Sequence, residues 1–311
     1  MKKAQFNFVR RPVDGLILLD KPQDMTSNQA LQKVRNLYRA EKAGHTGALD
    51  PLATGVLPIC LGEATKVAGL LLGNDKAYQV NAVLGITTDT DDADGQVLRE
   101  RAIGNYSRTQ MDTLVQEFIG DILQVPPVYS ALKQGGEPMY LKARRGDVIA
   151  LPARPVRIHA IELLALDERS LSLNVTCGSG TYIRSLVRDL GEALGCGAHV
   201  TALRRLWVEP FQALPVWTLD TLQTLAERGL PELDSVLHPV ADALVAVPKL
   251  VLDAEQARRV GMGQKIRISG PVQACERIQL CNGEGLPLGL AEMSAEGELT
   301  VQRLFRWAAV N

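Results

Sequence analysis

One aspartate stands in a segment shaped by glycine and proline. Residues 44–55 read GHTGALDPLATG, so Asp50 lies among three glycines and directly precedes Pro51. Glycine permits positive φ and close backbone approach, and proline pushes the residue before it towards an extended backbone. Such a loop can aim a single carboxylate at a ligand, with His45 a few residues upstream. The alternative is that Asp50 and Pro51 only begin a turn and that His45 is a surface residue.

The elements on either side of this loop can be predicted from apolar spacing. Residues 15–19 and 56–61 are short apolar runs that are typical of buried strands. Between them, Ser27 can cap a helix running to about residue 38. The apolar face of that helix comprises Leu31, Val34, Leu37 and Tyr38.

An acidic run follows the next two elements. Residues 63–72 predict a short helix that ends at Gly73, and Tyr78 to Ile86 predicts a strand. Four aspartates then occur within residues 89–94, which lead into an Asp-Gly pair typical of a hairpin turn. The run also suggests a calcium loop, but no glutamate stands at the EF-hand spacing. We therefore expect a turn.

Residues 124–147 form a long segment with little periodicity. It contains proline, glycine, lysine and arginine, interrupted by Tyr129 and Tyr140. A long irregular insertion in a compact domain is usually functional or disordered. The mixture of basic and aromatic residues suits a clamp on RNA.

The elements around this insertion show no repeated β–α–β unit, which favours the α+β class. They are a helix with Met111, Leu114, Val115 and Phe118 on one face, strands at 154–165 and 171–177, a helix that opens near Thr181, and a strand at 198–208.

The last third of the chain has a different pattern. A helix near 218–228 and the proline-punctuated segment 231–248 form a connector, after which Asp253 and Gln256 make a capping box. Short apolar runs with turn signals then predict a small β-barrel. Its strands are expected at 266–268, 277–280, 288–291 and 299–301, with a turn at Asn282-Gly283.

The composition is that of a globular protein. A chain of 311 residues with 46% hydrophobic and 22% charged residues suggests two domains with a large core. The net charge of −1 departs from the basic balance expected of a nucleic-acid binder. Basic clusters remain, and each is either a binding patch or an ordinary solvated face. One comprises Lys2, Lys3, Arg10 and Arg11, and the other Lys133, Lys142, Arg144 and Arg145.

Cysteine and histidine spacing argues against a disulfide framework or a metal site. The five cysteines form no C-x-x-C pair, and the four histidines show no ligand spacing. The glycine loop also lacks the Gly-Lys-Ser/Thr ending of a nucleotide-binding P-loop. No apolar stretch is long enough for a signal sequence or a membrane span. We expect reduced thiols, no metal, no membrane and a cytoplasmic protein.

Seven motifs, counting the loop at 44–55, follow one family in order and spacing. The other six are LDKP at 19–22, KAY at 76–78, PPVYSALK at 126–133, GTYIR at 180–184, GCGAHV at 195–200 and LRRL at 203–206. Over residues 14–210 the chain resembles the TruB family, the bacterial tRNA pseudouridine-55 synthases. In one departure, Asp24 stands where the family usually has glycine. A carboxylate near the phosphates of a bound RNA would lower the affinity for that RNA somewhat, but Asp24 is not one of the expected catalytic residues.

The resemblance implies a fold and an activity. The expected fold is a catalytic domain at 1–248, with a mixed, mainly antiparallel sheet and flanking helices, and a PUA-like RNA-binding domain at 249–311. The expected reaction converts a uridine in the T-loop of tRNA to pseudouridine after base flipping. It breaks a base–sugar C–N bond and makes a C–C bond to the same sugar, so no redox cofactor is required. The expected partner is the T-arm of tRNA, without guide RNA, and the protein is expected to be a monomer.

The resemblance also implies the site. Asp50 is the expected nucleophile or base, and Arg184 pairs with it, lowering the carboxyl pKa by about 1–3 units. Tyr78 stacks on the flipped base, a contact worth about 1–3 kcal/mol. Without the family match, Arg184 would be a solvent-facing helix residue and Tyr78 a core residue. The other expected substrate contacts are Tyr182, the backbone at Leu203, His45 in the space left by the flipped base, Lys21 and Arg204.

Two rival functions stay open on the sequence. The first is the RNA-guided branch of the same family, although the insertion at 124–147 resembles the standalone bacterial form. The second is an RNA-binding or RNA-folding module without catalysis. The presence of Asp50, Tyr78 and Arg184 argues against lost activity, and a tRNA-folding role alongside catalysis is compatible with it.

Overall fold

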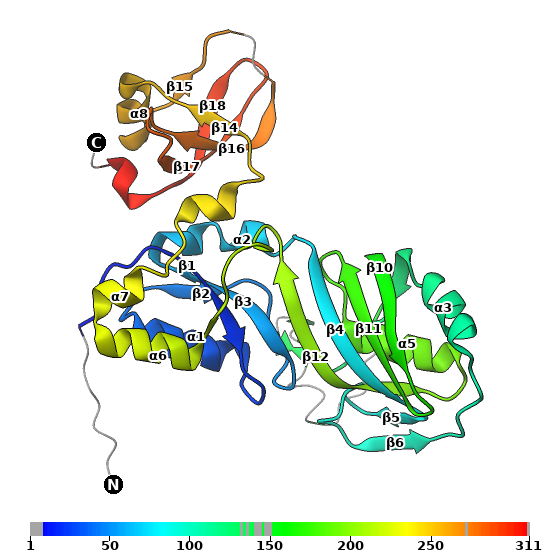
Figure 1. The fold of residues 1–311 in the computed structure, drawn as a ribbon. Coiled ribbons are helices and arrows are strands. Elements are labelled where there is room, and N and C mark those ends of the chain that lie inside the picture. Colours follow the sequence, from blue (N-terminus) through cyan, green and yellow to red (C-terminus); the bar gives the residue numbers. More distant parts are fainter. Residues whose placement is uncertain are drawn as a thin grey trace.

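The computed structural model describes residues 9–130, 133–134, 137–139, 145, 151–270 and 273–309. Figure 1 shows a long twisted sheet with helices packed on it, and a smaller C-terminal sheet above one end. Within the expected RNA clamp at 124–147, residues 131–132, 135–136, 140–144 and 146–147 lie outside the described residues. The same holds for Lys2, Lys3, Lys142, Arg144 and the side chain of Lys133.

The large sheet is mixed and mainly antiparallel, as expected for an α+β protein. Its strand order is β13-β1-β3-β12-β4-β11-β10-β7, with β2 paired to β3. The pairs β1–β13 and β3–β12 are parallel, and the other pairs are antiparallel. The strands are β1 (Gly15–Lys21), β2 (Ala43–His45), β3 (Thr54–Leu61), β4 (Lys76–Leu84), β7 (Gly120–Gln124), β10 (Arg154–Leu166), β11 (Ser170–Cys177), β12 (Ala198–Val208) and β13 (Trp217–Thr218).

Helices bury one face of this sheet. Leu31 and Val34 of α1, Met111 of α3 and Leu186 of α5 join strand residues such as Ile59 in the largest core cluster. The helices are α1 (Ser27–Leu37), α3 (Arg108–Gln116), α5 (Ile183–Ala193), α6 (Leu219–Arg228) and α7 (Leu230–Asp234). Shorter elements are η1 (Gly62–Lys66), α2 (Ala68–Leu71), η2 (Val240–Leu244), the hairpin β5 (Ile86–Thr88) with β6 (Val97–Glu100), and β8 (Lys133–Gln134) with β9 (Glu137–Pro138).

The C-terminal part is a curled half-barrel, and the expectation of a barrel needs this correction. The strand order is β14-β16-β17-β18-β15, and in the described residues β14 and β15 lie at opposite edges without pairing. The elements are β14 (Lys249–Val251), α8 (Ala254–Gly261), β15 (Ile266–Arg267), β16 (Cys275–Cys281), β17 (Pro287–Met293), β18 (Glu298–Leu304) and η3 (Arg306–Ala309). The capping box of Asp253 and Gln256 on α8 is confirmed.

Apolar and polar contacts attach this half-barrel to the large sheet. Phe305 and Leu290 join the cluster on the sheet face opposite α1, together with Leu18 and Val56. The backbone N–H of Arg306 donates to Glu63 Oε2 over 2.7 Å. The C-terminal sheet therefore rests on strands that also carry the loop of Asp50.

Two expected caps are wrong. Thr26, not Ser27, caps α1, because its extended backbone lets its hydroxyl accept from the N–H of Gln29. Ser27 is buried and exchanges hydrogen bonds with the backbone N–H and C=O of Leu49, at 2.8 and 3.0 Å. Similarly, α2 ends at Leu71, and Gly73 does not take the positive φ of a glycine cap.

The backbone at Asp24 explains why glycine is usual at this position and how aspartate is accommodated there. Asp24 has a φ of 60°, in the left-handed region that glycine occupies without strain and aspartate tolerates. Its N–H donates to the carbonyl of Pro51 over 2.9 Å. The turn at residue 24 is thus joined to the loop that follows Asp50.

Gly55 is needed where the Asp50 loop enters β3. A Cβ there would lie 2.1 Å from the carbonyl oxygen of Arg205, and the φ is 100°. We expect Gly55→Ala to lower the free energy of unfolding by about 2–4 kcal/mol, since strained backbone and overpacking each cost about 1–3 kcal/mol. Thermal unfolding measures the loss, with Gly73→Ala, which meets open space, as the control. A Gly55→Ala variant with the wild-type Tm would contradict this account.

Candidate active site

A pocket of about 260 Å³ lies between the Asp50 loop, two central strands and the start of α5. Tyr78 of β4 and Leu203 of β12 line it from the sheet. Tyr182 and Arg184 line it from the start of α5. The structure therefore brings five of the expected site residues around one cavity: Asp50, Tyr78, Tyr182, Arg184 and Leu203.

Asp50 is held by an ion pair and by its own loop. Its Oδ2 lies 2.9 Å from Arg184 Nε, and the Asp50 side chain is 40% exposed whereas that of Arg184 is 6% exposed. The Asp50 carbonyl accepts from the N–H of Ala53 over 3.1 Å. Ser27 fixes Leu49 on the other side. The carboxylate thus has a defined position with one face open to the pocket.

The pKa of Asp50 runs against the expectation. Burial raises the pKa of the carboxyl, and the nearby Arg184 charge opposes that rise without overcoming it. The guanidinium acts in the expected direction, but removal of the carboxylate from water is the larger effect. The net direction is therefore upward, and the expected net lowering is wrong.

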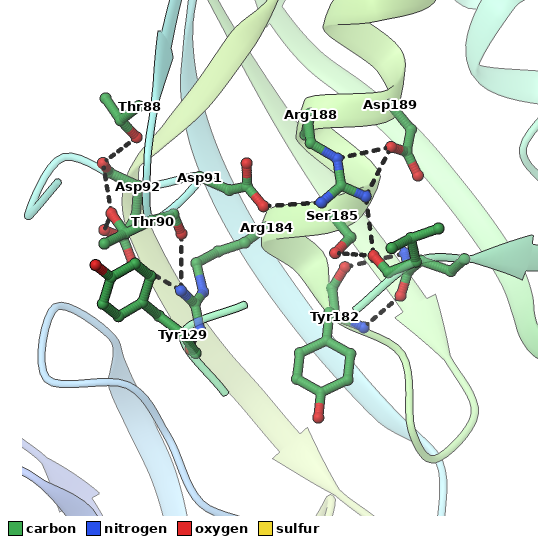
Figure 2. Close-up of polar contacts among 12 residues, drawn as sticks. Thr88, Thr90, Asp91, Asp92, Tyr129, Tyr182, Arg184, Ser185, Arg188 and Asp189 are labelled. Atoms are coloured by element: carbon green, nitrogen blue, oxygen red, sulfur yellow. Dashed lines mark hydrogen bonds and ion pairs between the residues drawn. The ribbon is translucent and has the colours of Figure 1, made fainter. Parts of the chain in front are cut away.

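Besides its pair with Asp50, Arg184 bonds to two other segments, and Figure 2 shows these further contacts. It donates from Nη1 to the carbonyl of Thr90 over 2.8 Å and from Nη2 to the carbonyl of Tyr129 over 2.9 Å. Asp92 Oδ2 lies 3.4 Å from Nη1, and both side chains of this pair are 6% exposed. The guanidinium is therefore shared between two carboxylates and fixed in orientation by two carbonyls.

The role of Asp92 was missed by the sequence analysis. The acidic run does turn between β5 and β6, as expected, but Asp92 is buried in it. Its only sequence signal is a run of charges, which usually marks a solvated turn. Its pairing with Arg184 depends on how the hairpin packs on α5.

A second set of contacts anchors the start of α5 (Figure 2). Arg188 Nη1 lies 2.9 Å from Asp91 Oδ2, and Ser185 Oγ donates to the carbonyl of Val125 over 2.9 Å. Gln124 accepts from the N–H of Tyr182 over 2.8 Å and donates to its carbonyl over 3.1 Å. These bonds set the direction in which Tyr182 and Arg184 leave the helix.

Three of the expected substrate contacts, namely His45, Lys21 and Arg204, do not line this pocket. His45 lies on β2, its Nδ1 is buried without a hydrogen-bond partner in the described residues, and burial and Arg205 lower its pKa. Lys21 is fully buried, and its Nζ donates to the carbonyls of Pro22, Met25 and Pro51 at 2.9, 2.6 and 3.3 Å. Burial lowers the pKa of Lys21 to about 8.

Arg204 lies in an adjoining groove. Its two Nη atoms pair with the carboxylate oxygens of Asp20 at 2.9 and 2.8 Å, and its side chain is 46% exposed. Asp20 thus offsets the positive charge of Arg204 locally, while part of the arginine side chain stays exposed.

The described residues show neither a metal centre nor a membrane-spanning helix. They contain no group of three or more His, Cys, Asp or Glu side chains placed to hold a metal ion. No helix in the same ranges is long and apolar enough to cross a bilayer.

Comparisons with known proteins agree over nearly the whole chain. Residues 35–183 match the N-terminal domain of TruB family pseudouridylate synthases. Residues 184–245 match the C-terminal domain of tRNA pseudouridylate synthase B, and residues 248–305 match the C-terminal part of pseudouridine synthase II TruB. A tRNA pseudouridine synthase B of Xanthomonas oryzae pv. oryzae is 55% identical over 295 residues, which is 95% of each chain. That of Stutzerimonas stutzeri is 50% identical over 305 residues, 97% of this chain and 99% of its own.

Solved structures show the same fold. A chain in a Cbf5-Nop10-Gar1 complex has a TM-score of 0.73 at 25% identity and covers 95% of this chain and 86% of its own. A chain in an H/ACA RNP bound to a substrate RNA containing 2′-deoxyuridine has a TM-score of 0.73 at 24% identity. The match covers 94% of this chain and 86% of that one.

The fold, the pocket and the matched domains together define a pseudouridine synthase, which is an isomerase. The relatives cover almost the full length of the chain, so both the catalytic sheet and the C-terminal half-barrel are included in the match. The chain belongs to the TruB family.

Proposed function

We propose that this enzyme makes pseudouridine at position 55 in the T-loop of tRNA, with Asp50 as the reacting carboxylate. The observation that carries the proposal is the 2.9 Å pair between Asp50 and the buried Arg184 at the wall of a pocket. The relatives named tRNA pseudouridine synthase B support the substrate.

The pocket suits one extruded base. At about 260 Å³ it is smaller than the usual 300–1,000 Å³ of drug-sized ligand sites. A uridine stacked in folded RNA cannot reach a carboxylate at this depth, so it must be flipped out at a cost of a few kcal/mol. Stacking on the ring of Tyr78 returns about 1–3 kcal/mol of that cost.

Each expected site residue has a role in this proposal. Arg184 orients Asp50 and opposes the burial-driven rise in its pKa, while Tyr182 and the backbone at Leu203 contact the edge of the uracil. His45, neutral through its lowered pKa, fills the space that the base leaves. Arg204 binds the RNA backbone with its open face. Lys21 supports the substrate site through the carbonyl of Pro51.

The chemistry needs no redox cofactor, because the C1′–N1 bond is exchanged for a C1′–C5 bond within one nucleotide. Asp50 is placed to act as a nucleophile towards the sugar or the ring, or as a base towards the sugar. We propose that the enzyme acts as a cytoplasmic monomer. Its five cysteines are free thiols, and the described lining of the pocket comes from this chain.

Purified protein and transcribed tRNA, with no guide RNA, provide the test. Pseudouridine at a single T-loop site would support the proposal and set aside both the RNA-guided alternative and a binding module without catalysis. Absence of product in this mixture would contradict it. A tRNA-folding role alongside catalysis would show as faster tRNA folding by an Asp50→Asn protein.

We also propose that residues 249–311 bind RNA outside the T-arm, as a module attached to the catalytic domain at 1–248. The salt dependence of binding tests this with the intact protein. Each phosphate neutralised steepens the slope of log K against log salt by about 0.7–0.9. We expect a steeper slope for full tRNA than for a T-arm hairpin, with equal single-turnover rates at saturation. Equal slopes for the two RNAs would contradict the proposal.

A further inference from the structure

Two buried cations line the active-site pocket without an ion-pair partner among the described residues. Arg205 of β12 is 1% exposed and Lys76 of β4 is 8% exposed, and both line the same cavity as Asp50. Neither forms a salt bridge with a carboxylate in the part of the chain that the structure describes. Taking an ion out of water costs several kcal/mol even in a relaxed protein.

Neutral carbonyls are the partners that the two cations do have. Arg205 donates from Nε to the carbonyl of Val56 over 2.6 Å and from Nη2 to that of Gly47 over 3.0 Å. Lys76 Nζ donates to the carbonyl of Leu72 over 3.4 Å and to that of Asn74. These bonds satisfy donors and tie down the loop stems, but a carbonyl carries no net charge that could pair with a cation.

The charge balance of the pocket is therefore positive before substrate enters. The lining contains Asp50 as its one carboxylate and three cations, namely Arg184, Arg205 and Lys76. Arg184 is already committed to Asp50 and Asp92. Burial, and then the neighbouring Arg205, lower the pKa of Lys76, and the more weakly acting charges of Asp75 and Glu209 oppose that fall without overcoming it.

The cations lie at the end of the pocket where the base is expected. Arg205 and Tyr78 are directly opposite each other on neighbouring antiparallel strands. The phenol of Tyr78 is buried beside the guanidinium: burial raises the pKa of Tyr78, and the charge of Arg205 opposes that rise. Since Tyr78 is the proposed stacking platform, a base held on it would lie within reach of this positive potential.

We propose that Arg205 and Lys76 stabilise the negative charge that the uracil ring acquires when the C1′–N1 bond breaks. This rests on the proposed function, in which the bond is exchanged within one nucleotide. The electron pair of the C1′–N1 bond leaves with the base and spreads over N1, O2 and O4. The sugar carbon is then either bonded to Asp50 or joined to C2′ by a double bond after Asp50 takes a proton. The base keeps this charge until C5 bonds to C1′, as the bond from C1′ to Asp50 breaks or as the proton returns from Asp50 to C2′. The proton on C5 then leaves and N1 gains one, which completes the isomer.

A more acidic base provides a test that structural damage alone would not mimic. The N1 anion of 5-fluorouracil is more stable than that of uracil, so its departure needs less help from the protein. We compare single-turnover loss of the parent nucleoside in T-arm RNA that carries uridine or 5-fluorouridine, using Lys76→Met and Arg205→Met. Removing one preorganised donor to a developing anion typically costs about 10²–10³ in rate. We expect a loss of about 100-fold on uridine and a loss at least tenfold smaller on 5-fluorouridine.

The remaining variants keep the test decisive. Arg205→Lys preserves the charge with fewer donors and should recover part of the uridine rate. Arg157→Gln, at an exposed pair with Asp121, is the matched control and should change neither rate. If Arg205→Met does not fold, as judged by its melting curve, Lys76→Met carries the comparison alone. Equal losses of rate on both RNAs would overturn the proposal. If RNA binding were also weakened, the two cations would be contacts to a phosphate of the RNA backbone and not to the base. Wild-type protein that makes no pseudouridine would contradict the proposed function itself.

Discussion

Replacing Asp50 with asparagine is expected to abolish pseudouridine formation while leaving tRNA binding within about tenfold of wild type, or about 1.4 kcal/mol. Asparagine is nearly isosteric with aspartate and tolerates the same turn, so the loop that Ser27 and Ala53 hold should keep its shape. The substitution removes the charge and the nucleophile together. Product formed in single-turnover reactions, and tRNA affinity by filter binding, are the two measurements.

The residual rate of the Asp50→Asn protein decides whether Asp50 is catalytic. A protein with Asp50→Asn that keeps even a tenth of the wild-type rate at any pH would show that the loop is only a binding element. Gly73→Ala is a suitable control for handling and folding, because an added methyl group meets open space there.

Arg184→Ala is expected to lower the rate by at least about 100-fold near neutral pH, by a different route. The guanidinium is the charge that opposes the burial-driven rise in the pKa of Asp50, so its removal raises that pKa further. A carboxyl with a raised pKa is protonated at acid pH and becomes ionised as the pH increases. The rate of the variant should therefore rise with pH over a range where the wild-type rate is already level.

Single-turnover rates from about pH 5 to 9 test this difference. The Asp50→Asn protein should show no recovery at any pH, whereas the Arg184→Ala protein should recover part of its rate at the alkaline end. Arg157→Ala removes an exposed guanidinium and should leave the profile unchanged. A flat profile for Arg184→Ala would mean that the arginine positions Asp50 without affecting its ionisation.

Much of the fold followed from local patterns. The apolar spacing of residues 15–19 and 56–61 predicted β1 and β3, and their side chains are buried as the runs required. The polar pair Asp253 and Gln256 predicted the start of α8, since a capping box satisfies its own backbone donors. Where local signals competed, the prediction failed. Thr26 and Ser27 are both good caps, and the burial of Ser27 against Leu49 decided between them.

The sequence by itself determined which residue types were present for chemistry. Glycine and proline around Asp50 specified an irregular loop with a single acid, and the order of the motifs specified the family. These properties are local, because they depend on which backbone angles each residue allows and on the residues next to it.

Only the tertiary structure decided which charges meet. Examples beyond the expected pair of Arg184 and Asp50 are the pairing of Arg184 with Asp92 and the burial of Lys21 under the loop. Another is the burial of Arg205 and Lys76 without a salt bridge in the described residues. The physical reason is that pairing and burial depend on strand order and helix packing, whereas the charge of a side chain is set by its type. An arginine in a sequence is a cation, and the folded sheet determines whether it faces water, a carboxylate or the lining of a pocket.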